Sequence, residues 1–359
     1  MTRTERQDVS GEIRQVYLEL STRCNLACKT CVRHSILNFK PEHMTLKTLK
    51  RLLPMLEELE SLERIVLLGF GEALCHPKIR EMLTLLRRVN TRLLLVTNAT
   101  FLTDAMNDLL VSLPLDDLFI SWDDDIDGGG DRIRQGARAE IFRRNAENLM
   151  NRIAARGSGK PSVGLEIVAT RRNSRHIEKT VRYGYSLGIR RFIITNLFPY
   201  TREMEEDILY TMGEGKAVKI KDIIRSPGKD ADLSLANWDG SGPRLCPFME
   251  RGTLFVKSSG EAAPCPELAY DHRAIYFGVE RLHRAYSPGH TGRMSLREIW
   301  EVPEFVRLRQ DFYYYEFPDC SSCHNPGRCY HRTEENGDCY NHTTPCGECL
   351  WAKNIVLCP

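Results

Sequence analysis

Three cysteines near the start of the chain have the spacing of ligands to one metal centre. Cys24, Cys28 and Cys31 form a Cys-x3-Cys-x2-Cys group directly after an apolar segment that ends at Leu20. Three thiolates this close together can hold a single four-iron cluster. Such a cluster keeps one iron without a protein ligand, and an open position is what catalysis at a metal requires. The spacing also allows a zinc site completed by His34, or free thiols.

A second set of cysteines fills the last third of the chain. Of the 13 cysteines, nine lie in this part: Cys246, Cys265, Cys320, Cys323, Cys329, Cys339, Cys346, Cys349 and Cys358. In a secreted protein such clustering would indicate disulfides, whereas in a cytoplasmic protein it more often indicates metal binding. The segment 319–359 has almost no apolar periodicity, so cross-linking by metal would explain how it folds.

The composition is that of an ordinary soluble globular protein. Of the 359 residues, 42% are hydrophobic and 27% are charged, and 50 basic against 48 acidic side chains leave a net charge of +2. This balance gives no reason to expect a nucleic-acid partner or a membrane surface. No apolar run reaches the roughly 20 residues that span a bilayer, and the polar N-terminus lacks the apolar core of a signal peptide. We therefore expect a cytoplasmic protein.

Short apolar segments alternate with amphipathic ones between residues 16 and 200. The predicted strands are Val16–Leu20, Arg64–Leu68, Arg92–Thr97, Asp117–Ser121, Ser162–Val168 and Arg191–Thr195. The predicted helices are Leu46–Leu59, Ile79–Val89, Asp104–Leu113, Ile141–Ile153 and His176–Leu187. Strands that alternate with helices predict an α/β fold with a parallel sheet or a partial barrel. Ligands of such folds bind beyond the C-terminal ends of the strands, where the cysteine triad also lies.

The alternation ends at about Tyr200, and this change predicts the domain organisation. We expect one domain over residues 1–200, a linker or bridging region over 201–240, and a small cysteine-rich domain over 241–359. Within the last domain, Thr253–Val256 and Glu261–Pro264 are expected to pair as a hairpin.

Polar residues and glycines stand at the ends of the predicted strands. They are Gly69, Gly71 and Glu72 after the second strand, Thr97 and Asn98 at the third, Ser121 at the fourth and Asn196 after the sixth. Glycine permits close backbone approach to a ligand, and strand-end carbonyls can accept hydrogen bonds from an ammonium group. Their order on successive strand ends, rather than any one of them, indicates a binding site.

The cysteine loop and these strand ends resemble those of radical S-adenosylmethionine (SAM) enzymes over about residues 14–200. The stretch CNLACKTC resembles the cluster loop of that family, and GFGEAL at residues 69–74 resembles the Gly-Gly-Glu-Pro motif that holds the methionine end of SAM. By the same resemblance, Thr97, Asn98, Ser121 and Asn196 are SAM-binding residues. Thr30 and Ala73 depart from the family pattern, which favours an aromatic residue and a proline at these positions.

The resemblance implies a partial (β/α)6 radical SAM barrel whose [4Fe–4S] cluster binds SAM. It implies reductive cleavage of SAM to a 5′-deoxyadenosyl radical, which abstracts a hydrogen atom from the substrate, with a reductant such as ferredoxin or flavodoxin. Among acidic residues after the fourth strand, Asp123 is the candidate catalytic group, whereas Asp124 and Asp125 are interpreted as solvated. Strand alternation does not decide whether Glu166 points into the barrel.

The C-terminal cysteines resemble the SPASM extension of radical SAM enzymes, which binds two auxiliary [4Fe–4S] clusters. Cys246, the Gly-x4-Cys that ends at Cys265, and the Cys-x2-Cys-x5-Cys that ends at Cys329 match the family arrangement. The next cysteine of the family is absent, because Thr333 occupies its position. Nine cysteines supply eight ligands with one to spare. Taken alone, the two Cys-x2-Cys pairs would also suit a zinc ribbon.

The chain's end resembles a narrower group, the maturases associated with tungsten-containing aldehyde ferredoxin oxidoreductase-like enzymes. The stretches DCYN at 338–341, CGECLW at 346–351 and IVLCP at 355–359 carry this resemblance. It implies a protein, peptide or cofactor-precursor substrate. The alternative enzyme is a maturase of a ribosomally made peptide, which the lack of an added N-terminal peptide-binding domain disfavours. A non-enzymatic iron–sulfur or zinc protein would explain the cysteines but not the strand-end motifs.

Overall fold

The computed structural model describes residues 11–113, 115–129, 132–211, 224–240, 244–276, 278–320, 322–324, 329 and 337–359. The strands are β1 Gln15–Leu18, β2 Arg64–Leu67, β3 Arg92–Thr97, β4 Asp117–Ser121, β5 Ser162–Ala169, β6 Arg191–Asn196, β7 Asp232–Leu235, β8 Thr253–Val256, β9 Glu261–Ala263, β10 His272–Tyr276, β11 Val279–His283 and β12 Gly289–His290. The α-helices are α1 Leu46–Glu57, α2 Ile79–Leu86, α3 Asp104–Ser112, α4 Ala139–Arg156, α5 Ile177–Ser186, α6 Arg202–Glu206, α8 Pro247–Glu250, α9 Leu296–Trp300 and α10 Pro303–Tyr314.

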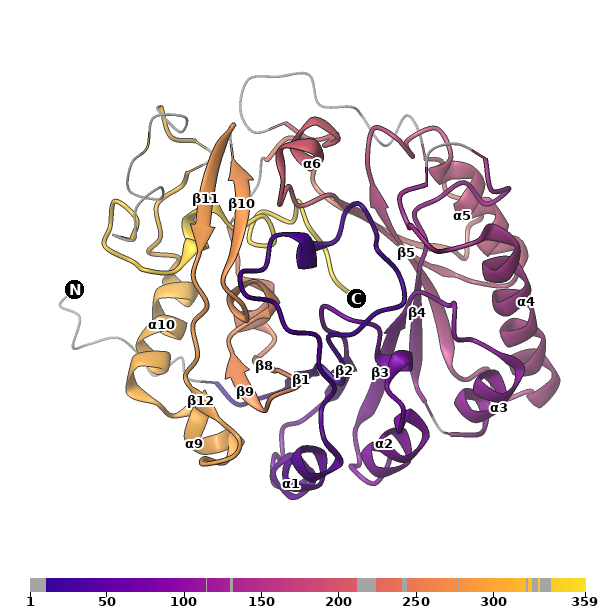
Figure 1. Cartoon of the computed structure of the whole chain (residues 1–359), viewed down its shortest axis with the longest axis horizontal. Helices are drawn as coiled ribbons and strands as arrows, with labels where there is room; N and C mark the ends of the chain where they lie inside the picture. The colour runs from indigo at the N-terminus through magenta and orange to yellow at the C-terminus, as the bar shows by residue number, and fades with distance from the viewer. Residues whose placement is uncertain are drawn as a thin grey trace.

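One long sheet organises the molecule. Its ten strands have the order β12-β9-β8-β1-β2-β3-β4-β5-β6-β7. Strands β1 to β7 are parallel to their neighbours, and β8 also runs parallel to β1. Figure 1 shows α1 to α5 outside this curved sheet, with the C-terminus of the chain inside the curve. The α/β fold with a partial parallel barrel, as expected from the alternation, is confirmed.

Local sequence accounts for the barrel elements. The four residues of β1 are all buried, as the continuous apolar run of a parallel strand requires. Helix α1 begins where the Thr45 hydroxyl accepts a hydrogen bond from the backbone N–H of Thr48, which satisfies a donor at the helix start. Its buried leucines lie at three- and four-residue spacing, which turns one helix face toward the sheet.

The region expected to be a linker contributes to the sheet. Residues 202–206 form α6, and β7 pairs with β6 in parallel register. The predicted hairpin is present as β8 and β9, and β8 pairs with β1 along its whole length. The cysteine-rich part therefore joins the first strand of the barrel through backbone hydrogen bonds, a long-range pairing that no local pattern specified.

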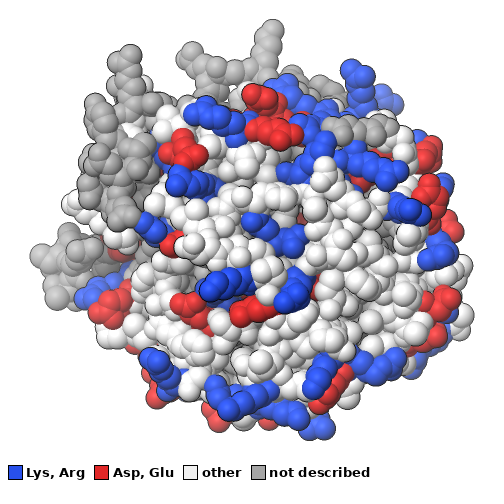
Figure 2. All heavy atoms as spheres, viewed as in Figure 1, with Lys and Arg blue, Asp and Glu red and all other residues white. Residues whose placement is uncertain are grey.

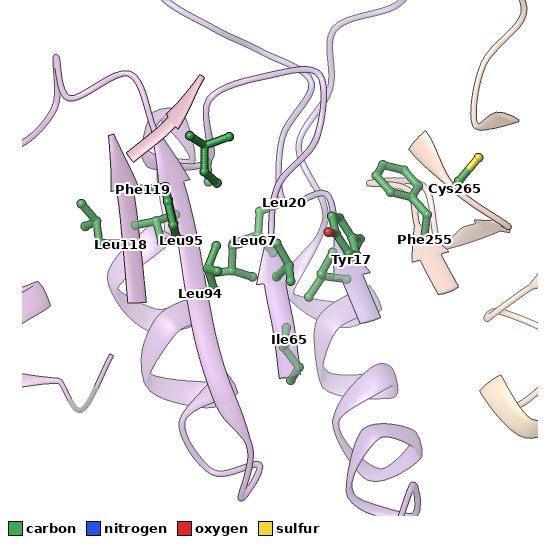
Figure 3. Packing of buried hydrophobic residues seen from close by; sticks show 14 of the residues in the cluster. Tyr17, Leu20, Ile65, Leu67, Leu94, Leu95, Leu118, Phe119, Phe255 and Cys265 are labelled. Atoms are coloured by element: carbon green, nitrogen blue, oxygen red, sulfur yellow. The ribbon is translucent and has the colours of Figure 1, made fainter. Parts of the chain in front are cut away.

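The hydrophobic core of the barrel continues across the junction between β1 and β8. Figure 3 shows Tyr17, Leu67 and Leu95 of the barrel in one layer with Phe255 and Cys265 of the cysteine-rich part. Tyr17 and Phe255 are essentially inaccessible to solvent, so both parts share one hydrophobic core.

The last residues of the chain enter the barrel. The backbone N–H of Leu357 donates to Thr195 Oγ1 at 2.7 Å, and the hydroxyl of Tyr17 donates to the carbonyl oxygen of Pro359 at 3.3 Å. The tail thus runs from β6 to β1, between the two ends of the partial barrel (Figure 1).

The surface matches the near-neutral net charge. On the face seen in Figure 2, basic and acidic side chains are interspersed with uncharged ones. No helix within the described ranges is both long and apolar enough to cross a bilayer.

Candidate active site

A cavity of about 250 Å³ opens at the C-terminal ends of β1 to β5. Nine of the residues singled out from the sequence line it: Cys24, Cys28, Cys31, Gly69, Gly71, Glu72, Thr97, Asn98 and Ser121. Arg134 and Glu166 also line it. The structure therefore gathers residues as far apart in the sequence as Cys24 and Glu166 around one space.

The cysteine loop after β1 is held from two sides. The backbone N–H groups of Ala27 and Lys29 donate to the carbonyl oxygens of Gln135 and Ile133, at 3.0 and 2.8 Å. The Arg33 guanidinium donates through Nε to Cys31 Sγ at 3.3 Å. A cation beside a thiol stabilises its deprotonated form, which is the form that binds metal.

The donor set of this loop fits an iron–sulfur cluster. Burial raises the pKa of Cys24 and raises that of Cys28 to about 12, so these thiols stay protonated until a metal replaces the proton. The zinc alternative needs His34 as a fourth ligand, but the Nε2 of this exposed ring lies 3.0 Å from the carbonyl oxygen of Cys28. Three thiol ligands remain, as an open cluster requires.

The glycine-containing loop lies directly on the cysteine loop. A Cβ atom on Gly71 would come within 2.3 Å of the carbonyl oxygen of Ser21, and one on Gly69 within 2.4 Å of Glu19 Cγ. The N–H of Glu72 donates to the carbonyl oxygen of Arg23 at 2.8 Å. Glycine is required at both positions because a side chain at residue 71 would meet the backbone of residues 21–23, and one at residue 69 would meet the Glu19 side chain.

Glu72 fixes the end of β3. Its buried carboxylate accepts hydrogen bonds from the N–H of Leu74 at 3.1 Å, the hydroxyl of Thr97 at 2.8 Å and the N–H of Asn98 at 2.8 Å. Burial raises the pKa of Glu72, while these donors favour the ionised form. The Asn98 amide in turn lies 3.7 Å from Cys24 Sγ, so the strand end and the cluster loop are in contact.

A buried ion pair supports the side of the cavity formed by β4 and β5. Nε of Arg134 lies 2.8 Å from Oδ2 of Asp123, and Oδ1 of Asp123 accepts from the N–H of Val168 at 2.8 Å. Although burial opposes the charge, the Asp123 carboxylate raises the pKa of Arg134. Arg134 is therefore a fixed cation at the cavity wall.

The acidic residues after β4 differ from expectation. The carboxylate of Asp123, the candidate catalytic group, is absent from the cavity lining and is engaged in holding Arg134. Asp124, expected to be solvated, is 8% exposed and accepts from the N–H of Ile133 at 2.6 Å. Asp125 pairs with Lys179 at 3.1 Å. These carboxylates hold the described residues after β4 in place by accepting hydrogen bonds from the backbone N–H groups of Asp127, Ile133 and Arg134.

Two residues show what sequence reasoning missed. Glu166 points into the barrel, where its Oε2 accepts a hydrogen bond from the Ser121 hydroxyl at 3.2 Å. Burial, followed by the nearby Asp123, raises the pKa of Glu166 to about 7. Alternation along β5 allowed this orientation without deciding it, and Arg134 lies in a loop with no recognisable pattern.

Asn196 is the one predicted SAM-binding residue outside the cavity lining. Its side-chain amide donates to the carbonyl oxygens of Asn237 at 2.7 Å and Ile355 at 3.0 Å. The contacts at this position anchor the C-terminal tail, because β6 faces that tail rather than the open space.

The C-terminal cysteines separate into groups. Cys246, Cys265, Cys346 and Cys349 line a small space of about 20 Å³ with apolar neighbours that include Phe248. Burial raises the pKa of Cys246 to about 11 and raises that of Cys265 further. Three buried thiols and the partly buried Cys349 thus line one small space, and four thiolates are the number that a four-iron cluster takes.

The remaining cysteines before Cys346 follow α10 in the sequence. The pKa of Cys339 is raised by burial, by Asp338 and by the neighbouring Cys329 and Cys323. Cys320 comes three residues before Cys323 in the sequence, and its backbone N–H donates to the carbonyl oxygen of Gly347 at 3.2 Å. These four cysteines and Cys358 are the five that the first group leaves available for a second auxiliary cluster.

Cys358 stands apart from both groups. Its Sγ accepts from Nε1 of Trp351 at 3.2 Å, and it lies within electrostatic range of Tyr17 and Glu166 in the barrel. Cys75 is also separate from the C-terminal groups, with its Sγ 3.8 Å from Asn25 Oδ1.

One buried group beside the auxiliary cysteines has metal-binding residue types. The same Oε1 of Glu267 lies 2.9 Å from His272 Nε2 and 2.6 Å from His283 Nδ1. These are hydrogen-bond distances. The pKa of Glu267 falls to about 2 because the histidines outweigh the effect of burial. These hydrogen bonds join the three side chains to one another.

The chain belongs to the radical SAM superfamily, whose sequence pattern it matches over residues 18–212, and residues 246–324 match the SPASM iron–sulfur cluster-binding domain. It is therefore an enzyme that uses SAM and iron–sulfur clusters, as the resemblance implied. A similar protein is the tungsten-containing aldehyde ferredoxin oxidoreductase cofactor-modifying protein of Pyrococcus furiosus, which is 27% identical over 97% of both chains. The PqqA peptide cyclase of Gluconobacter oxydans is 28% identical over 86% of this chain and 82% of its own.

Solved structures share the fold. Streptococcus suis SuiB bound to SAM has a TM-score of 0.63 at 17% identity, covering 92% of this chain and 73% of SuiB. The anSMEcpe protein with bound SAM has a TM-score of 0.56 at 16% identity, covering 94% and 95%. At this identity the similarity establishes the common architecture.

Glu166 predicts a pH dependence of stability. Its pKa is raised from 4.5 in the unfolded chain to about 7 in the fold, so the fold binds a proton that the unfolded chain has lost. The contribution of Glu166 to the free energy of unfolding should be complete below pH 4.5 and should decrease as the pH rises to about 7. Glu166→Gln should reduce the loss between pH 5 and pH 8 by roughly 1–3 kcal/mol. Urea unfolding of the cluster-free chain measures this.

The exposed Glu57 provides the control, since Glu57→Gln should leave the pH dependence of the free energy of unfolding as it is in the natural chain. An equal pH dependence in the natural chain and the Glu166→Gln variant would contradict the buried position assigned to Glu166.

Proposed function

We propose that this enzyme is a maturase that acts on an organic cofactor, or its precursor, of a tungsten-containing oxidoreductase. The observation that carries the proposal is the similarity to the Pyrococcus cofactor-modifying protein over 97% of both chains. The peptide cyclase has nearly the same identity over a smaller share of the chain, which makes peptide modification the second candidate.

The cavity residues suit this function through their charges and backbone groups. Cys24, Cys28 and Cys31 would hold the cluster, and the loop that contains Gly71 would receive the methionine end of SAM. The bound cluster and SAM together supply a hydrogen-abstracting radical. Fixed donors and charges that face the reactants require no reorganisation during the reaction.

Three side chains of the cavity wall extend this assignment. The Arg134 guanidinium, held in place by Asp123, would bind a carboxylate in the cavity. Ser121 and Glu166 would bind hydroxyl groups, with Glu166 able to accept a proton near neutral pH. Asp123 then acts as a positioning residue for Arg134.

The two C-terminal groups of four cysteines would each hold one auxiliary cluster, with Cys358 as the spare thiol. Complete ligation by protein favours electron transfer as the role of these clusters, since no iron is left open to bind substrate. A carrier such as ferredoxin or flavodoxin would deliver electrons, and the reducing cytoplasm would preserve the thiol ligands.

The substrate class can be tested by isotope transfer. The reconstituted enzyme would be incubated with SAM, a reductant and the organic cofactor extracted from a tungsten oxidoreductase of cells grown in deuterated medium. Deuterium should appear in 5′-deoxyadenosine, because hydrogen abstraction moves a substrate hydrogen to that product. A deuterated PqqA-type peptide forms the parallel arm. Deuterium transfer from the peptide alone would overturn the proposal in favour of peptide modification.

The cysteine triad gives a second prediction. Changing Cys24, Cys28 and Cys31 together to Ala should abolish formation of 5′-deoxyadenosine and reduce the iron content from about 12 to about 8 atoms per chain. The auxiliary iron should remain because its ligands lie in another part of the chain. Continued 5′-deoxyadenosine formation by the triple variant would refute the assigned SAM site.

The auxiliary ligands give a third prediction with a matched pair of variants. Cys349→Ser should remove about four iron atoms, since this thiol completes one group of four. Cys358→Ser should retain all the iron, because its sulfur contacts Trp351 and the barrel instead. Iron and sulfide analysis distinguishes the two. The opposite pattern, with iron lost only in the Cys358 variant, would reverse the ligand assignment.

A further inference from the structure

A buried carboxylate lies between residues 69–72, which we call the SAM loop, and the SPASM region that contains Ser258 and Tyr270. Glu19 follows β1 and is 1% exposed. Its Oε1 accepts a hydrogen bond from the N–H of Phe70 at 2.8 Å. Its Oε2 accepts from the hydroxyl of Tyr270 at 2.5 Å and from the N–H of Ser258 at 3.4 Å. One side chain therefore contacts the barrel loop with one oxygen and the SPASM region with the other.

The loop at residues 69–72 depends on this carboxylate for its position. The Glu19 side chain fills the space where a Cβ of Gly69 would lie, and it holds the next N–H of the same loop. Both Gly69 and Phe70 line the cavity. A movement of Glu19 would thus move the backbone that is proposed to receive the methionine end of SAM.

Tyr270 is fixed from the auxiliary side. It comes five residues after Cys265, and its carbonyl oxygen lies 2.9 Å from Nδ1 of His272. Its ring meets the ring of Phe70 edge-on at 5.3 Å between centroids. Lys257 Nζ lies 4.2 Å from the Tyr270 ring centroid. The Tyr270 ring thus packs against Phe70 of the SAM loop, and the Tyr270 hydroxyl is connected to the same loop through Glu19.

We propose that Glu19 and Tyr270 are positioning residues that couple the loop carrying Cys265 to the SAM loop. This inference rests on the proposed function only in assigning the methionine end of SAM to residues 69–72. Correct placement of Tyr270, which an intact auxiliary site around Cys265 would maintain, increases the affinity for SAM. The coupling requires no contact between SAM and either residue.

The test is Tyr270→Phe, which keeps the ring and removes only the hydroxyl. In the fully reconstituted enzyme, the SAM dissociation constant should rise about tenfold, because a buried hydrogen-bond acceptor loses a donor. The iron content should be unchanged. The KM for SAM should rise together with the dissociation constant, while kcat at saturating SAM stays near that of the natural enzyme. A general loss of structure would lower kcat and iron content as well.

The control is Tyr276→Phe on neighbouring β10. The Tyr276 hydroxyl is buried, and within the described part of the chain it has no hydrogen-bond partner. This variant makes the same chemical change without touching Glu19, so SAM affinity should stay unchanged. Glu19→Gln should weaken SAM binding, and adding Tyr270→Phe to it should cause little further loss because both changes break one connection.

Two outcomes would overturn the inference. Natural SAM affinity in Tyr270→Phe would show that the hydroxyl does not position the loop. Equal losses in the Tyr270 and Tyr276 variants would show a general effect of hydroxyl removal. A Gly71→Ala variant separates this failure from failure of the proposed site. If Gly71→Ala also leaves SAM affinity unchanged, residues 69–72 do not receive SAM, and the site assignment itself is wrong.

Discussion

The site depends on the close approach of two backbones, the cysteine loop after β1 and the glycine-containing loop after β2. Their parallel strands end side by side, and the N–H of Glu72 donates to the carbonyl oxygen of Arg23. The approach is possible only because Gly71 has no side chain. The Glu72 carboxylate then accepts hydrogen bonds from Thr97 and Asn98, which fixes the end of the next strand, β3, relative to these loops. A sequence of short contacts between neighbouring strand ends thus sets the geometry of the cavity.

Sequence reasoning succeeds where the information is local. The strands are short apolar runs, and the residues at their C-terminal ends must meet because parallel strands share one edge. Gly69, Glu72 and Ser121 could therefore be placed in one site without knowledge of any contact. Asn196 follows the same rule, but the tail occupies the space beside it. The orientation of that side chain depends on residues more than 150 positions away.

Other features could not be predicted because they arise from pairing distant segments. Nothing in the sequence of β8 indicates that it pairs with β1. Likewise, nothing in the sequence around Arg134 indicates that this residue lies near Cys28. Spacing also failed to separate the cysteines, since Cys349 and Cys358 are close in the chain yet lie in different surroundings. The physical cause in each case is tertiary packing, which overrides or supplements local pattern.

The tail shows how the two metal-binding parts become one structure. Beyond Cys349 it buries Trp351, whose ring lies 5.2 Å from that of Phe198 and 6.3 Å from that of Phe248. Phe248 belongs to the pocket of the auxiliary cysteines, and Phe198 follows β6 of the barrel. Aromatic packing therefore connects these two regions. Because the proposed ligand Cys349 and the barrel-facing Cys358 flank this aromatic contact, metal binding at the first should stabilise the position of the second.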